Sequence, residues 1–136
     1  MSDREVLNRA LGCFADPTRR SSYFDLYAEN VVLHRYVGVD PGLESVKKYY
    51  GALWSAFQDA KVNTADLVEQ GDKIAMRFVF TGTHLGPFLN IAPTGKTVSV
   101  AGMTILKFNA ADRCVERWRF TDRISMLSQL GVNPVY

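Results

Sequence analysis

The stretch KIAMRFVFTGTH, residues 73–84, carries an apolar side chain at every second position of its first half. Such an alternation, with a period of two, is typical of a β-strand that buries one face. One face would carry Ile74, Met76, Phe78, Phe80, Gly82 and His84. The other face would carry Ala75, Arg77, Val79, Thr81 and Thr83. We therefore predict a strand over residues 73–84.

The same period continues on both sides of this strand. Residues 61–69 form a preceding strand, and Gln70-Gly71-Asp72 between the two is a hairpin signal. A long strand is predicted over 97–108 and the last one over 113–121, with a turn at 109–112 between them. The second half of the chain is therefore predicted to be a meander of antiparallel strands.

Helical spacing dominates the first part of the chain. Ser2 and Glu5 have the form of a capping box, which predicts a helix over residues 3–15. A second short helix is expected around residues 23–27. Residues 31–37, rich in branched and aromatic side chains, are predicted to be a strand.

A third helix shows the clearest amphipathic stripe. Its apolar side chains recur at helical spacing and are Val46, Tyr49, Tyr50, Leu53, Trp54 and Phe57. A last short helix over residues 123–130 would end at Gly131. Helices early in the chain and strands late in it predict an α+β fold. We expect one domain over residues 1–136, in which a curved mixed or antiparallel sheet forms a cone with helices packed on its concave face.

The composition excludes several classes of function. Sixteen Lys and Arg against fourteen Asp and Glu leave a net charge of +2, and no basic run exceeds two residues, so no nucleic-acid partner is expected. No apolar run approaches the roughly 18 residues that a membrane helix needs, so no membrane association is expected either. The polar N-terminus predicts no signal peptide. We interpret Cys13 and Cys114 as buried thiols of a cytoplasmic protein.

Five stretches resemble, in the same order, the SnoaL-like proteins of the NTF2-like superfamily. They are YAENVVLH at 27–34, EQGD at 69–72, MRFVFTGTHLG at 76–86, PTGK at 93–96, and Glu116-Arg117-Trp118 with Asp122 and the following MLSQLG. This resemblance covers nearly the whole chain and implies the cone-shaped fold. It also implies the chemistry of the SnoaL-like cyclases, in which an Asp removes a proton alpha to a carbonyl and the enolate closes onto a second carbonyl.

Asp122 is the first candidate catalytic residue. Alternation along the last strand would place on one face Cys114, Glu116, Trp118, Phe120 and Asp122. With Trp118 and Phe120 pointing into the cone, the carboxylate would lie near an apolar interior, where it suits proton transfer. A cap of the helix that starts at Arg123 is the alternative interpretation. The resemblance implies the catalytic role, because the SnoaL-like cyclases carry their acid/base Asp at the matching position.

Two histidines are the other titratable candidates. His34 shares a strand face with Val32 and Tyr36, and a neutral imidazole there could bond to Asp122 or to a substrate carbonyl. The alternative is a histidine satisfied within the core. His84 ends the apolar face of residues 73–84, which favours a structural role or a place at the rim of the cavity.

Aromatic residues are in excess, with eight Phe, six Tyr and two Trp. Many fall on surfaces that are predicted to face one another, which indicates a pocket for a flat, carbonyl-bearing ligand. The candidate substrate-binding residues are Trp118, Tyr36, Trp54, Tyr49, Tyr50, Phe78, Phe80, His84 and Phe120, and core packing is the alternative for each aromatic ring. Three arginines, Arg77, Arg117 and Arg119, have the opposite parity and are interpreted as part of a solvated or intersubunit sheet face.

The leading functional hypothesis is therefore a cyclase of hydrophobic, carbonyl-bearing molecules such as polyketides, using cofactor-free acid/base catalysis by Asp122 and His34. No cofactor or metal is expected, because the chain lacks a phosphate loop or dinucleotide fingerprint and its two histidines lie 50 residues apart. A non-catalytic binding protein, an isomerase and an epoxide hydrolase of the same fold are the alternatives. The resemblance further implies a homodimer that forms through the outer face of the sheet.

Overall fold

The computed structural model describes residues 1–132. The first part of the chain forms two helical segments and one strand. Helix α1 (Asp3–Ala15) begins at Ser2, whose hydroxyl accepts a hydrogen bond from the backbone N–H of Glu5 at 3.2 Å. A 3₁₀ helix, η1 (Arg20–Leu26), leads directly into strand β1 (Tyr27–His34). Strand β1 thus starts and ends earlier than the sequence pattern predicts, and the backbone turns at Arg35, which has a φ of 66°.

The rest of the chain consists of one helix, four consecutive strands that form most of the sheet, and a last short helix. They are α2 (Leu43–Ala56), β2 (Lys61–Gln70), β3 (Lys73–Thr83), β4 (Thr97–Phe108), β5 (Cys114–Thr121) and α3 (Arg123–Gln129). Helix α2 buries the apolar stripe seen in the sequence, including Val46, Tyr50 and Leu53. Across residues 1–132, no helix is both long and apolar enough to cross a membrane.

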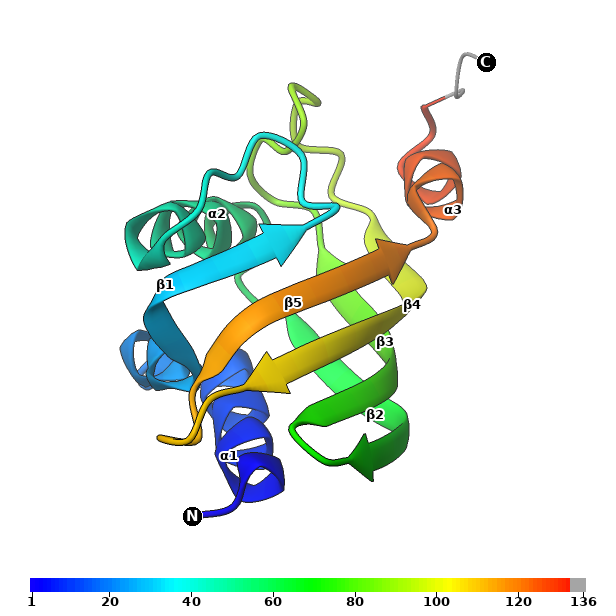
Figure 1. Ribbon diagram of the computed structural model, residues 1–136. Coiled ribbons are helices and arrows are strands. Elements are labelled where there is room, and N and C mark those ends of the chain that lie inside the picture. The colour runs from blue at the N-terminus through cyan, green and yellow to red at the C-terminus, as the bar shows by residue number, and fades with distance from the viewer. Residues whose placement is uncertain (133–136) are drawn as a thin grey trace.

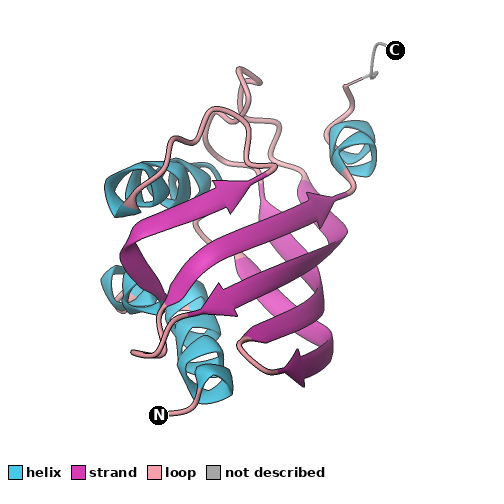
Figure 2. Ribbon diagram, in the orientation of Figure 1, coloured by secondary structure: helices cyan, strands magenta, loops and turns pink. Residues whose placement is uncertain are grey.

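The five strands form one mixed sheet in the order β1-β5-β4-β3-β2. Strand β1 runs parallel to β5, and every other neighbouring pair is antiparallel. The sheet is strongly curved, and α1 and α2 lie together on its concave side (Figures 1 and 2). The predicted α+β class, with helices on the concave face of a curved sheet, is confirmed.

The concave face of the central strands is the core side. In the register of β3 and β4, Ile74 lies opposite Leu106 and Phe80 lies opposite Val100, and all four side chains are buried. The convex face of the same strands carries Arg77 opposite Met103, and both are exposed. The alternation read from residues 73–84 therefore sets the two faces of the sheet.

Strand β5 departs from simple alternation near its start. Phe108 pairs with Cys114, but the next residue back on β4, Lys107, pairs with Glu116, so that two steps on β5 match one step on β4. This extra residue is a β-bulge, which reverses the direction of the side chains that follow it. Cys114 and Arg117 consequently both face the interior, although three positions separate them.

Gly102 allows the ring of Phe78 to lie across β4. A Cβ atom at Gly102 would lie 2.9 Å from the backbone oxygen of Phe120 and closer still to the Phe78 ring. We expect Gly102→Ala to lower the free energy of unfolding by about 1–3 kcal/mol, because the added methyl overpacks this contact. Chemical denaturation measures the change.

Gly51→Ala is the matched control, since Gly51 lies in α2 and a Cβ there would meet nothing within 4 Å. That variant should be as stable as the parent or more so, because alanine favours a helix. Equal stability of the two variants would contradict the proposed close contact at Gly102.

Candidate functional site

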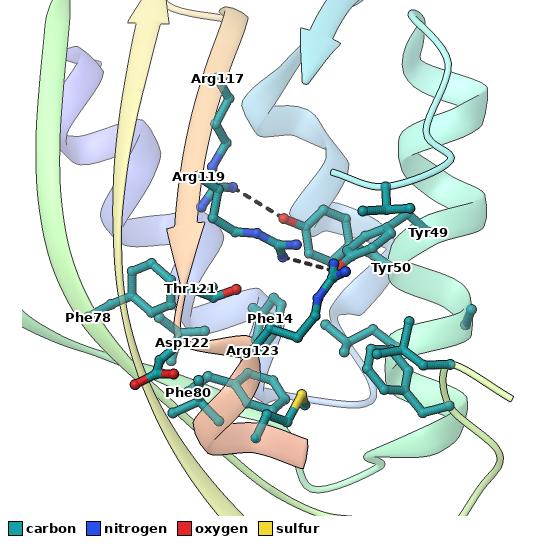
Figure 3. A pocket seen from close by; sticks show the side chains of 18 of the residues that line it. Phe14, Tyr49, Tyr50, Phe78, Phe80, Arg117, Arg119, Thr121, Asp122 and Arg123 are labelled. Carbon is teal, nitrogen blue, oxygen red and sulfur yellow. Dashed lines mark hydrogen bonds between the residues drawn. The ribbon is translucent and has the colours of Figure 1, made fainter. Parts of the chain in front are cut away.

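A cavity of about 310 Å³ lies between helix α2 and the concave face of the sheet. Much of its wall is aromatic, supplied by Phe14, Tyr23, Tyr49, Tyr50, Phe78, Phe80 and Phe88. Figure 3 labels the rings of Phe14, Tyr49, Tyr50, Phe78 and Phe80 and the polar side chains near them. The volume is that of a small-molecule site.

The polar groups of this wall come mainly from the end of β5 and the start of α3. They are Arg117, Arg119, Thr121, Asp122 and Arg123. The first three point inward because they follow the bulge at two-residue intervals. The cavity therefore combines apolar walls with three cationic side chains and one carboxylate.

Arg117 is buried beneath the cavity, with 6% of its surface exposed. Its Nη1 donates hydrogen bonds to the hydroxyl oxygens of Tyr27 at 2.7 Å, Tyr23 at 3.1 Å and Tyr50 at 3.3 Å. Its Nε donates to the hydroxyl of Thr104 at 2.9 Å. These partners are neutral oxygens, so the hydrogen bonds do not neutralise the positive charge of the guanidinium.

The tyrosines around Arg117 keep their protons at physiological pH. Burial raises the pKa of Tyr27 and Tyr36 well above the ordinary value, although the nearby positive charge of Arg117 acts in the opposite direction. Burial likewise raises the pKa of Tyr23 and Tyr50. The phenols therefore supply polar atoms but no counter-charge.

Arg119 lies next along the same face of β5. Its Nη1 donates to the hydroxyl of Tyr49 at 2.8 Å, and its guanidinium carbon lies 3.8 Å from the centre of the Tyr36 ring. Such cation–π contacts favour a charge that is partly removed from water. The Nε atom of Arg119 is buried and has no hydrogen-bond partner within residues 1–132.

Asp122 lies at the mouth of the cavity and caps helix α3. One carboxylate oxygen accepts a hydrogen bond from the backbone N–H of Ser125 at 2.9 Å. The side chain is exposed, and Figure 3 shows it beside Thr121 at the end of β5. The structure therefore has both features considered for Asp122, since the residue caps a helix and also borders the cavity.

The expected orientation of the residues before Asp122 is wrong. Trp118 and Phe120 lie on the convex face, where Phe120 is 54% exposed, while Arg117 and Arg119 face the cavity. The bulge between Cys114 and Glu116 is the physical reason, because it shifts the alternation by one residue. Nothing in the sequence pattern marks this bulge, although an excess of tyrosine hydroxyls that need partners is a weak signal for a buried arginine.

His34 is not brought together with Asp122. Its Nε2 lies 2.7 Å from a carboxylate oxygen of Glu116, and its ring stacks on Trp118 with a centroid separation of 5.2 Å. Both partners belong to the convex side of the sheet, and none of these three residues borders the cavity.

The other predicted substrate-binding residues divide into two groups. Tyr49, Tyr50, Phe78 and Phe80 line the cavity, as expected from their place on α2 and β3. The second group is buried behind the wall and consists of Tyr36 beneath Arg119, Trp54 against Phe14, and His84. His84 stacks on Phe57, and its Nδ1 accepts a hydrogen bond from the backbone N–H of Thr94 at 3.2 Å.

No cluster of three or more His, Cys, Asp or Glu side chains suitable for a metal ion occurs in residues 1–132.

Comparisons with known proteins agree with this architecture. A family model described as SnoaL-like polyketide cyclase matches residues 5–130. The crystal structure of IdmH from Streptomyces antibioticus, a candidate polyketide cyclase, is 25% identical with a TM-score of 0.79, and the match covers 97% of this chain and 100% of that one. No curated protein matches the sequence.

Two further solved structures share the fold at lower identity. AclR of Streptomyces galilaeus, a candidate hydroxylase, is 22% identical with a TM-score of 0.83, over 98% of this chain and 83% of that one. A SnoaL-like polyketide cyclase of Agrobacterium tumefaciens is 18% identical with a TM-score of 0.77, over 96% and 99%.

Two substitutions of Asp122 distinguish the contribution of its helix-capping hydrogen bond to stability from the contribution of its negative charge. Asp122→Ala removes the acceptor for Ser125 and should lower the free energy of unfolding by about 1 kcal/mol, whereas Asp122→Asn keeps an acceptor and should change it little. Urea denaturation measures both. Ser128→Ala, at an exposed position in α3, is the control and should stay within about 0.5 kcal/mol of the parent. An alanine variant as stable as the parent would show that the cap contributes nothing.

Proposed function

Because the chain belongs to the SnoaL-like polyketide cyclase family, we propose that it catalyses a cofactor-free proton transfer on a hydrophobic, carbonyl-bearing small molecule bound in the cavity. The observation that carries this proposal is the carboxylate of Asp122 at the mouth of an aromatic-walled cavity. Apolar walls would take up the body of such a molecule, and the carboxylate would meet its acidic C–H group.

The proposed chemistry is an intramolecular aldol-type cyclisation. Asp122 accepts a proton from a carbon alpha to a carbonyl, and the substrate's own conjugation spreads the negative charge. The enolate carbon then forms a bond to a second carbonyl carbon, and the resulting alkoxide takes the proton back from Asp122. Holding a flexible substrate folded in the cavity supplies proximity.

Asp122 has a carboxylate oxygen that remains available to accept a proton from a substrate. One oxygen accepts from Ser125, and the second has no hydrogen-bond partner within residues 1–132. His34 lies on the convex face with Glu116, so the proposed mechanism does not use it.

Removing the carboxylate should abolish proton transfer while the fold is retained. We expect Asp122→Asn to slow enzyme-catalysed exchange of the methyl protons of 2-acetylnaphthalene into D₂O by about 10²–10⁴-fold. Nuclear magnetic resonance follows the exchange, and circular dichroism verifies the fold. Ser128→Ala, on the exposed side of α3, should exchange at the parent rate. Parental activity in Asp122→Asn would refute the role of the carboxylate.

A non-catalytic binding protein is the second candidate, and one observation favours it. Asp122 is exposed and already engaged as a helix cap, which accounts for the residue without catalysis. If the parent protein binds 2-acetylnaphthalene but does not accelerate proton exchange, and if Asp122→Ala leaves this binding unchanged, the binding function is supported instead.

Homodimerisation through the convex face is also part of the proposal. In the register of β4 and β5, Met103 lies opposite Phe120 and Ile105 lies opposite Trp118. Exposed fractions of 58% for Met103, 42% for Ile105 and 54% for Phe120 leave an apolar patch on this face. A second copy of the chain would cover the patch.

We also propose a cytoplasmic location. Cys13 and Cys114 are buried free thiols, which fit a reducing compartment.

Charge placed in this patch should dissociate the dimer. We expect light scattering to give the mass of a dimer for the parent protein at micromolar concentration and of a monomer for Met103→Glu. Leu85→Glu, at an exposed apolar position in the loop after β3, should remain dimeric. A monomeric parent protein would contradict the proposed dimer.

A further inference from the structure

Two of the three cationic side chains in the cavity wall lie on β5 and have no carboxylate beside them in the part of the chain that the structure describes. Arg117 and Arg119 occupy successive inward positions of β5, and both line the cavity. In residues 1–132, the contacts within 4.0 Å between basic and acidic side chains are His34 with Glu116 and Lys47 with Glu44, so neither of these arginines has a carboxylate at that distance. A buried cation is costly unless it is paired, and the apolar surroundings increase this cost.

Neutral groups already meet part of the hydrogen-bonding capacity of the two arginines. Arg117 donates from Nε and Nη1, and Arg119 donates from Nη1. Within residues 1–132, neither Nη2 atom has a hydrogen-bond partner, and the Nε atom of Arg119 is buried without one. Each guanidinium therefore keeps donors for a further acceptor.

The nearby phenols do not serve as counter-ions. Burial raises the pKa of Tyr23, Tyr27, Tyr36 and Tyr50, so these groups remain neutral at physiological pH. Asp122, the acidic residue of the cavity wall, is exposed at the mouth and bonds to the start of α3. The positive charge is left for a ligand to neutralise.

We propose that the molecule bound in this cavity carries a carboxylate, which Arg117 and Arg119 bind while the aromatic wall receives its apolar body. The inference rests on the proposed function only in taking this cavity as the substrate site, and it narrows the substrate class to hydrophobic carboxylic acids. A carboxylate suits the guanidinium fork, because two oxygens can accept hydrogen bonds side by side. The aromatic wall around the arginines favours an organic acid over a small inorganic anion.

The test compares an anion with a neutral molecule of the same shape. The probes are 2-naphthoate and 2-naphthamide, and calorimetric titration of the full chain gives the dissociation constant of each. We expect the parent protein to bind 2-naphthoate at least 10-fold more tightly than 2-naphthamide. Equal affinities for the two probes would overturn the inference without the need for any variant.

Arg119→Met then assigns the preference to the cavity. This substitution should weaken 2-naphthoate binding at least 10-fold and change 2-naphthamide binding less than 2-fold. Arg77→Met removes the same charge from the convex face of β3, where Arg77 is exposed, and should bind both probes as the parent does. Parental affinity of Arg119→Met for 2-naphthoate would refute binding at this site, and an equal loss in Arg77→Met would indicate attraction by net charge alone.

Arg117→Met tests the second guanidinium, and circular dichroism shows whether it folds, because it removes the partner of three tyrosines. If it folds, the preference for 2-naphthoate should fall as in Arg119→Met. If it does not fold, the comparison of probes on the parent protein and on Arg119→Met decides the inference.

Asp122→Asn separates this inference from the proposed catalysis. The variant should retain the preference for 2-naphthoate even where proton exchange is lost. Loss of exchange in Asp122→Asn without any preference for the anion in the parent would support the catalytic role and refute the inference. The preference without catalysed exchange would support the inference and refute the catalytic role.

Discussion

The guanidinium of Arg117 is the interaction on which this arrangement depends. It joins strand β5 to Tyr23 of η1, Tyr27 of β1, Tyr50 of α2 and Thr104 of β4. Hydrogen bonds to a charged group are worth about 1.5–3 kcal/mol each, and a partner left without one inside the protein costs a similar amount. The 3₁₀ helix η1, helix α2, the edge strand β1 and the central strands of the sheet are therefore all joined at one buried charge.

This junction also explains much of the tyrosine content. The hydroxyls of Tyr23 and Tyr27 lie 2.6 Å apart, those of Tyr36 and Tyr50 lie 3.2 Å apart, and all four rings are buried. Buried phenols need hydrogen-bond partners, and they find them in one another and in Arg117. The polar part of the core is thus a network that surrounds one cation and extends to the cavity wall.

The sequence predicts the fold well because the patterns that determine it are local. Alternation over residues 73–84 gives the buried face of β3, and the apolar stripe of residues 46–57 gives the face of α2, so the predicted cavity-lining roles of Tyr50 and Phe78 follow from spacing. The capping of α3 by Asp122 is also readable, since Asp before a short helix is a common cap.

The chemistry of the cavity is harder to predict because it depends on one inserted residue. The bulge at the start of β5 exchanges the two faces of the strand, which moves Trp118 to the convex side and Arg117 to the core. An apolar residue is normally expected inside and an arginine outside, so both composition and parity favour the wrong assignment. The bulge lies beside the short turn from β4 to β5, but no local sequence pattern marks it, and the pairing of β5 with β1 involves residues far apart in the sequence.

The same bulge also sets the polarity of the cavity along β5. Arg117, Arg119 and Thr121 follow one another on the concave face, and Asp122 comes next where the strand ends and α3 begins. At about 3.3 Å per strand residue, the backbone positions of Arg119 and Asp122 lie about 10 Å apart. Arg117 and Arg119 thus come before Asp122 along the wall, and a third cation, Arg123, follows it at the start of α3. A ligand bound as proposed has its acid group at one end. Its carboxylate would point toward the arginines, which leaves its far end, where an acidic C–H group would be needed, facing Asp122.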